Sequence, residues 1–174
     1  GPAQLYLHLS AELIRVIVTC GGCDAERGVM GRYVSPLGEV RLGDLAQVGG
    51  KGAHLGELIG AGFSVPPGFS VKSEGHDRFF NAADLKKPIE EIAAGIDFRN
   101  LKDVEEKTAR IREIISTAPI PEDVEMEIRE AYEALREEEA EIPLVAVRSS
   151  VGTKDLSRSS FPGQMDTFHN VRGI

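Results

Sequence analysis

Apolar positions recur with helical spacing in two segments of the second half of the chain. Residues 101–117 place a set of aliphatic side chains on one helical face: Leu101, Val104, Ile111, Ile114 and Ile115. A further helix is expected to begin at Pro121, which suits a first helical turn, and to run to about Glu138. Its apolar stripe comprises Val124, Ile128, Ala131 and Leu135. We expect residues 84–141 to form a helical insertion that packs outside the sheet and has a structural role.

Shorter periodic segments predict three more helices, at residues 51–61, 73–81 and 88–94. Ser73 is expected to be the N-cap of the second, because a serine hydroxyl can accept from an unpaired N–H of the first turn.

Continuous or alternating apolar runs predict strands. Residues 144–147 form an uninterrupted apolar run of strand length, which is typical of a buried strand. Further strands are expected at residues 32–34, 69–71 and 165–171. Residues 3–19 fit either a helix or a strand, so residues 1–31 are treated as an N-terminal extension of uncertain status. The pattern predicts an α/β (α+β) domain over residues 32–174, with a small mixed sheet and flanking helices.

Composition narrows the possible partners. The chain has 174 residues, is 41% hydrophobic and carries a net charge of −8, which suits a globular domain and disfavours nucleic acid and anionic membranes. The most apolar early run, residues 5–18, is shorter than the ~20 residues that cross a bilayer. Cys20 and Cys23 lack a second pair of metal ligands and are interpreted as thiols in a reducing, cytoplasmic setting.

The first candidate site is a glycine-rich turn that precedes the predicted helix at residues 51–61. Gly50 and Gly52 flank Lys51, so backbone N–H groups, the positive end of a helix dipole and a full charge come together. That combination suits a phosphate group. The alternative is a helix cap with a lysine that faces solvent. A Walker A loop is excluded, because Leu45 stands at the first glycine position and Gly52 at the Ser/Thr position.

The second candidate site is Arg148, which follows the apolar run at residues 144–147 and precedes a loop rich in hydroxyl groups. A guanidinium matches two phosphate oxygens at once. The alternative is an arginine paired with one of the chain's many carboxylates.

Four segments together resemble a known family. Residues 48–58 (VGGKGAHLGEL) and 61–69 (AGFSVPPGF) are similar to the start of phosphoenolpyruvate synthase, and the pattern is shared with pyruvate, phosphate dikinase and rifampin phosphotransferase. Residues 145–150 (VAVRSS) and 160–173 (SFPGQMDTFHNVRG) resemble the next signature of the same domain.

The resemblance implies an ATP-grasp-like nucleotide-binding domain in which ATP phosphorylates a histidine on a separate domain. Lys51 and Arg148 match the essential phosphate-binding lysine and arginine of the family. The resemblance adds further residues at the phosphate end of the nucleotide: Gly163, Gln164 and Thr167. The implied partners are ATP and the domains, or a partner subunit, that carry the phosphohistidine. Mg²⁺ is implied too, with its acidic ligands on a part of the cleft that this sequence lacks.

The chain also departs from the family pattern. Lys154 stands where an acid is usual, and Pro162 replaces a common alanine. None of the four histidines has the sequence setting of the phosphorylated histidine. We therefore expect the chain to be inactive alone. A non-catalytic member that binds a nucleotide or a partner is the alternative, and a purely structural helical module is the third possibility.

Overall fold

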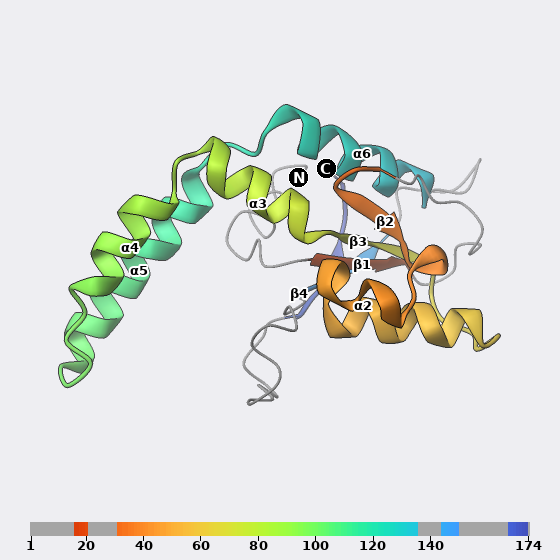
Figure 1. Ribbon diagram of the computed structural model, residues 1–174, viewed down its shortest axis with the longest axis horizontal. Coiled ribbons are helices and arrows are strands. Elements are labelled where there is room, and N and C mark those ends of the chain that lie inside the picture. Colours follow the sequence, from red (N-terminus) through yellow and green to blue (C-terminus); the bar gives the residue numbers. More distant parts are fainter. Residues whose placement is uncertain (1–15, 21–30, 136–143, 150–166, 174) are drawn as a thin grey trace.

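A five-stranded sheet lies at the centre of the protein (Figure 1). The computed structural model describes residues 16–20, 31–135, 144–149 and 167–173. The strand order is β2-β3-β1-β4-β5. The strands are β1 (Val16–Cys20), β2 (Val34–Pro36), β3 (Gly68–Val71), β4 (Val145–Ser149) and β5 (Thr167–Val171).

The sheet confirms the α/β prediction and corrects one detail of it. Every strand pair in the described sheet is antiparallel, so the sheet is not mixed. The reason is β1, which comes from the segment of uncertain status and lies between β3 and β4. It runs opposite to both, so these two strands, which are parallel to each other, never pair. A short apolar run cannot reveal such a central position.

The described helices agree with the predicted ones to within a few residues at most boundaries. They are α2 (Leu45–Gly60), α3 (Ser73–Ala82), α4 (Lys86–Ala94), α5 (Leu101–Thr117) and α6 (Glu122–Ala134), preceded by the short 3-10 helices η1 (Leu37–Glu39) and η2 (Leu42–Asp44). The prediction for Ser73 was wrong. Lys72 is the N-cap of α3, and the Ser73 hydroxyl instead donates to the Glu74 carboxylate from inside the helix.

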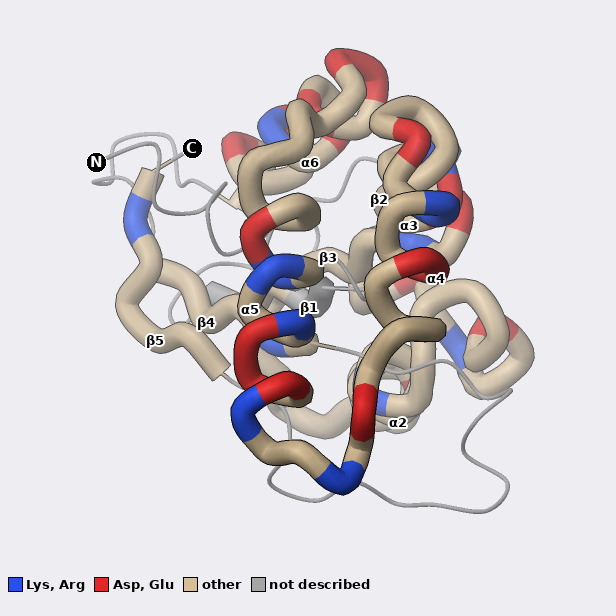
Figure 2. Tube along the Cα trace, turned by 90° about the vertical axis from the view of Figure 1, so that its left-hand side faces the viewer, with Lys and Arg blue, Asp and Glu red and all other residues tan. Residues whose placement is uncertain are grey.

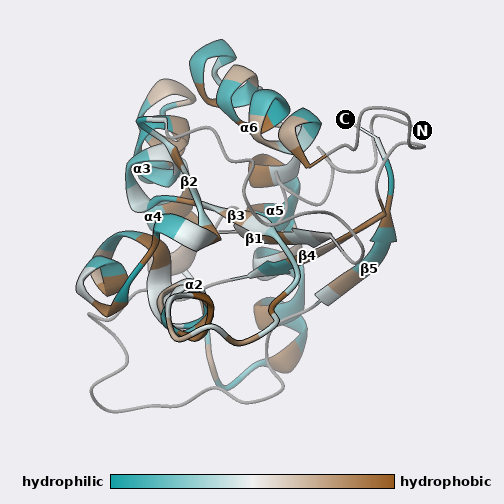
Figure 3. Ribbon diagram, turned by 90° about the vertical axis from the view of Figure 1, so that its right-hand side faces the viewer, coloured by the Kyte–Doolittle hydropathy of each residue, from teal (hydrophilic) through white to brown (hydrophobic). Residues whose placement is uncertain are grey.

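The two faces of the sheet are covered by different helices, with α6 on one side and α2 on the other (Figures 1 and 3). The predicted stripe of α6 is buried and packs on the sheet. Its partners alternate along the strands, as the side-chain period of two requires: Val18, Val34, Phe69, Val71, Val145, Val147 and Val171. The main core therefore lies between α6 and the sheet, and part of the predicted insertion helps to form it.

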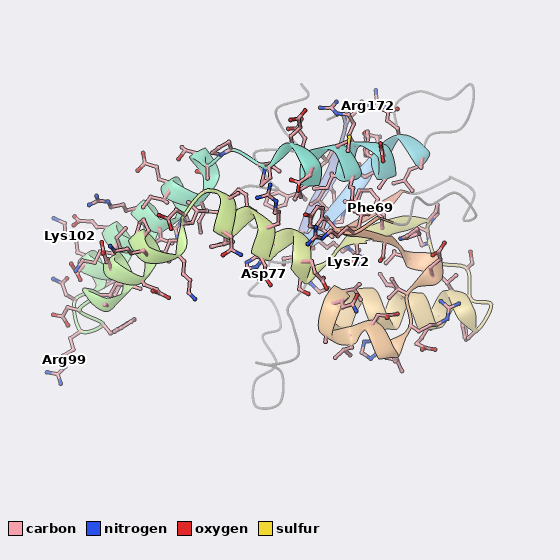
Figure 4. All side chains as sticks on the ribbon, turned by 45° about the horizontal axis from the view of Figure 1, so that its top comes forward. Phe69, Lys72, Asp77, Arg99, Lys102 and Arg172 are labelled. Atoms are coloured by element: carbon pink, nitrogen blue, oxygen red, sulfur yellow. The ribbon has the colours of Figure 1, made fainter. Side chains whose placement is uncertain are left out.

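The rest of that insertion projects from the body as an antiparallel pair of helices, α4 and α5 (Figure 1). A separate cluster around Phe79 and Leu85 holds the base of this arm, and Ile120 packs against both this cluster and the main core. Arg99 and Lys102 lie at the far end of the arm, away from Phe69 and the sheet (Figure 4).

The arm has a largely solvated surface. Basic and acidic residues alternate along α5 (Figure 2), and no residue of this helix is fully buried. Leu101 is 72% exposed, because α5 begins at the tip of the arm. None of the described helices is long and apolar enough to cross a membrane.

Candidate functional site

The glycine turn lies inside α2, where the helix breaks and restarts. Gly49 has φ 74° and ψ 171°, a conformation that residues with a side chain rarely adopt. The helix resumes directly after it, so Gly50, Lys51 and Gly52 form the first turn of the new segment. The N–H groups of a first turn have no partner within the helix. The predicted helix start at Lys51 thus corresponds to this restart rather than to the first residue of α2.

Lys51 connects this turn to the end of β4. Its Nζ donates a hydrogen bond of 3.0 Å to the carbonyl oxygen of Ser149, a residue 98 positions away in the chain. Ser149 directly follows Arg148, so the structure brings the two predicted charged residues to one place. An ammonium group has three donors, and this bond uses one of them.

Arg148 lies in β4 with part of its guanidinium group buried. Its Nε is inaccessible to solvent and has no hydrogen-bond partner among the described residues. A buried donor without an acceptor costs free energy. The alternative interpretation was an ion pair between Arg148 and a carboxylate. Within the described part of the chain, no carboxylate pairs with Arg148.

Thr167 is the residue on β5 that pairs with Arg148. Directly opposed residues project from the same face of an antiparallel sheet, so both belong to the face covered by α2. Thr167 is half-buried. Gly163 and Gln164, the other two predicted residues, lie outside the described residues.

His54 is a neighbour of the turn that the prediction did not use. Its Nδ1 lies 2.6 Å from the carbonyl oxygen of Gly50, so this nitrogen carries the proton and donates.

Among the described residues, no cluster of three or more His, Cys, Asp or Glu side chains could hold a metal ion.

A surface hollow of about 510 Å³ lies elsewhere, between α3 and the start of α6. Two of its charged side chains are paired with each other: Arg78 donates to Asp123 at 2.9 Å, and Tyr33 donates to the same carboxylate. The bond from Arg78 and, to a smaller extent, the one from Tyr33 hold the pKa of Asp123 below its usual value. These contacts explain the cluster as a link between α3, α6 and the start of β2.

Two buried hydroxyl groups near the site were missed by the sequence reasoning. Ser70 and Ser149 are both buried, and neither hydroxyl has a partner among the described residues. Side chains alternate between the two faces along β3 and β4, so each serine could be assigned to one face of the sheet. That assignment requires the position of β1, which the sequence does not reveal.

The fold is that of an α/β domain of the ATP-grasp-like class. Residues 45–174 match the family described as pyruvate phosphate dikinase, AMP/ATP-binding domain. The chain belongs to this family.

Curated relatives agree with this assignment. The chain is 39% identical over 145 residues to a probable phosphoenolpyruvate synthase of Methanothermobacter thermautotrophicus, a match that covers 83% of the chain and 21% of the relative. It is 43% identical over 145 residues to a protein of the same description from Staphylothermus marinus, covering 82% of the chain and 17% of the relative. The phosphoenolpyruvate synthase of Escherichia coli is 35% identical over 140 residues, or 78% of the chain and 18% of the relative. The chain spans about a fifth of the length of these relatives.

Proposed function

We propose that this chain is the part of a phosphoenolpyruvate synthase-like phosphotransferase that holds the phosphates of ATP. In this proposal Lys51 and Arg148 contact phosphate oxygens, and the N–H groups of Gly50 and Gly52 complete the cradle. Thr167, which pairs with Arg148, contributes from β5. Gly163 and Gln164 are included in the proposal because of their place in the signature segment, and both lie outside the described residues. The observation that supports the proposal most directly is the hydrogen bond from Lys51 to the strand that carries Arg148.

Phosphoryl transfer needs positioning and charge stabilisation more than covalent help from the protein. The bond to Ser149 leaves two N–H donors on Lys51 for phosphate oxygens, and it fixes the distance between the turn and β4. Arg148 provides a second positive charge from β4. Two fixed positive charges then offset the negative charge that spreads over the transferred group.

The complete reaction needs groups from the rest of the longer protein. We propose that the phosphoryl group passes to a histidine on a separate domain and from there to an acceptor. We assign the Mg²⁺ ligands to the rest of such a protein. The chain alone then binds ATP without turnover.

An NMR titration of the ¹⁵N-labelled chain with ATP tests the proposal. We expect saturable shifts of the Gly50 and Gly52 amides, and binding about tenfold or more weaker in Lys51→Met and Arg148→Gln, because each loses a hydrogen bond to a charged ligand. Lys86→Met removes an exposed charge on the arm, far from the turn, and is the matched control. Absence of shifts in the wild type, or equal binding by Lys51→Met and Lys86→Met, would contradict the proposal.

A further inference from the structure

Ser70 lies in the same row of the sheet as Arg148. Both residues pair with Ile17 of β1, Ser70 from the β3 side and Arg148 from the β4 side. Residues in one row share a face, so both are on the side of the sheet that α2 covers. Two strand spacings separate them, or roughly 10 Å.

The hydroxyl of Ser70 faces the first turn after the break in α2. A Cβ placed on Gly52 would lie 3.4 Å from Ser70 Oγ. Ser70 is 0% exposed, so no ligand can reach it directly. Its Oγ nevertheless has no hydrogen-bond partner among the described residues.

This combination is unfavourable in the ligand-free state. A buried hydroxyl without a partner costs free energy, and alanine would fill the same place without that cost. The adjacent turn is the segment of α2 whose N–H groups lack helical partners. A small movement of this turn would give the hydroxyl a backbone group to bond.

We infer that Ser70 is a positioning residue for the glycine turn. Its hydroxyl gains a backbone partner when the turn binds the phosphates of ATP, and it thereby holds Gly50 to Gly52 in the binding arrangement. This inference rests on the proposed function. It adds a residue outside the signature segments, and it makes the turn itself the element that responds to ATP.

The test compares ATP affinity with ligand-free stability in Ser70→Ala. We expect ATP to bind about fivefold more weakly, the effect of one ordinary hydrogen bond. The thermal midpoint of the ligand-free chain should stay equal to that of the wild type or rise. Affinity comes from the NMR titration of the whole chain with ATP, and stability comes from thermal unfolding by circular dichroism without nucleotide.

Two further variants separate the hydroxyl from its surroundings. Ser70→Cys keeps a side chain of similar size but hydrogen-bonds weakly, so it should bind ATP as poorly as Ser70→Ala. Ser35 pairs directly with Ser70 on the neighbouring strand β2, and Ser35→Ala should leave affinity unchanged.

Three results would overturn the inference. Wild-type affinity in Ser70→Ala or in Ser70→Cys would show that the hydroxyl has no part in binding. Loss of affinity together with a lower midpoint would show an ordinary packing role. Absence of ATP binding in the wild type would refute the proposed function itself, and this inference with it, which distinguishes that failure from the first two.

Discussion

Replacing Gly56 with alanine tests whether a close backbone contact holds α2, and with it the glycine turn, against the body. A Cβ on Gly56 would lie 2.1 Å from the carbonyl oxygen of Val40 and 2.7 Å from its carbonyl carbon. The carbonyl oxygen of Leu37 would be 3.0 Å away. Non-bonded carbon atoms are best separated by roughly 3.5–4.0 Å. The helix would therefore have to move by about 1 Å.

The expected cost follows from two opposing effects. Overpacking typically costs about 1–3 kcal/mol, and the upper end applies here because the obstacle is backbone and cannot rotate away. Alanine is favoured over glycine inside a helix by about 1 kcal/mol. Gly56→Ala should therefore lower the free energy of unfolding by about 2 kcal/mol, which corresponds to a fall of about 4–8 °C in the thermal midpoint for a chain of this size.

Urea unfolding followed by circular dichroism measures the change. Gly43→Ala is the matched control, because a Cβ on Gly43 meets nothing within 4 Å. We expect the control to keep the wild-type midpoint to within about 0.5 kcal/mol. Equal midpoints for Gly56→Ala and Gly43→Ala would refute the reasoning, since they would show that α2 does not depend on this contact. The Gly50 amide shift should also move in Gly56→Ala, because the displaced helix carries the turn.

Two other predictions concern the contacts of α6 with β2 and α3. The Glu127 carboxylate accepts three backbone N–H groups from residues 32–34, at 2.7–3.1 Å, so Glu127→Ala should destabilise the chain by about 3 kcal/mol in urea unfolding. A loss below about 1 kcal/mol would mean that water replaces the carboxylate. Asp123 has a folded-state pKa below its usual value, chiefly through the hydrogen bond from Arg78. Its contribution is therefore present above pH ~4 and is lost as the pH falls through the folded-state pKa. Asp123→Asn should lose less stability than the wild type between pH 5 and pH 2 in thermal unfolding, and parallel pH profiles would contradict this.

The sequence contains enough information for much of the local structure, and it selects Lys51 and Arg148 as candidate site residues. The stripe of α6 follows from helical periodicity, and it is buried as expected. Lys51 and Arg148 could be paired because both lie in signature segments that resemble one family. Their approach through Ser149 is consistent with that pairing, although a hydrogen bond to a backbone carbonyl has no sequence signature.

The long-range organisation could not be predicted, for physical reasons. Strand β1 is a run of five residues, and its central place depends on pairing with partners about 50 and 130 residues away. Glu127 is one of many glutamates on α6, and nothing local distinguishes the one whose carboxylate binds the start of β2. Gly56 belongs to a glycine-rich motif, but its need for hydrogen in place of a Cβ arises from Val40, which precedes the motif.

The pairing of β4 with β5 shows how the core and the site share one strand. Thr167 pairs with Arg148 on the face of α2, and Phe168 pairs with Val147 on the face of α6. With strict alternation, Val171 would then project toward α2. It is buried in the core instead, because the register shifts by one residue between Val145 and Val147.

The shift is a β-bulge, and Asn170 next to it has φ 58°, a conformation that asparagine tolerates better than most residues. If the bulge were absent and Val171 kept its place in the core, Thr167 would turn away from Arg148 and Phe168 would replace it on the face of α2. The irregular pairing therefore allows β5 to hold two apolar residues in the core and still present a hydroxyl beside the arginine. Asn170 therefore helps to place Thr167 in the candidate site, although its own side chain is exposed.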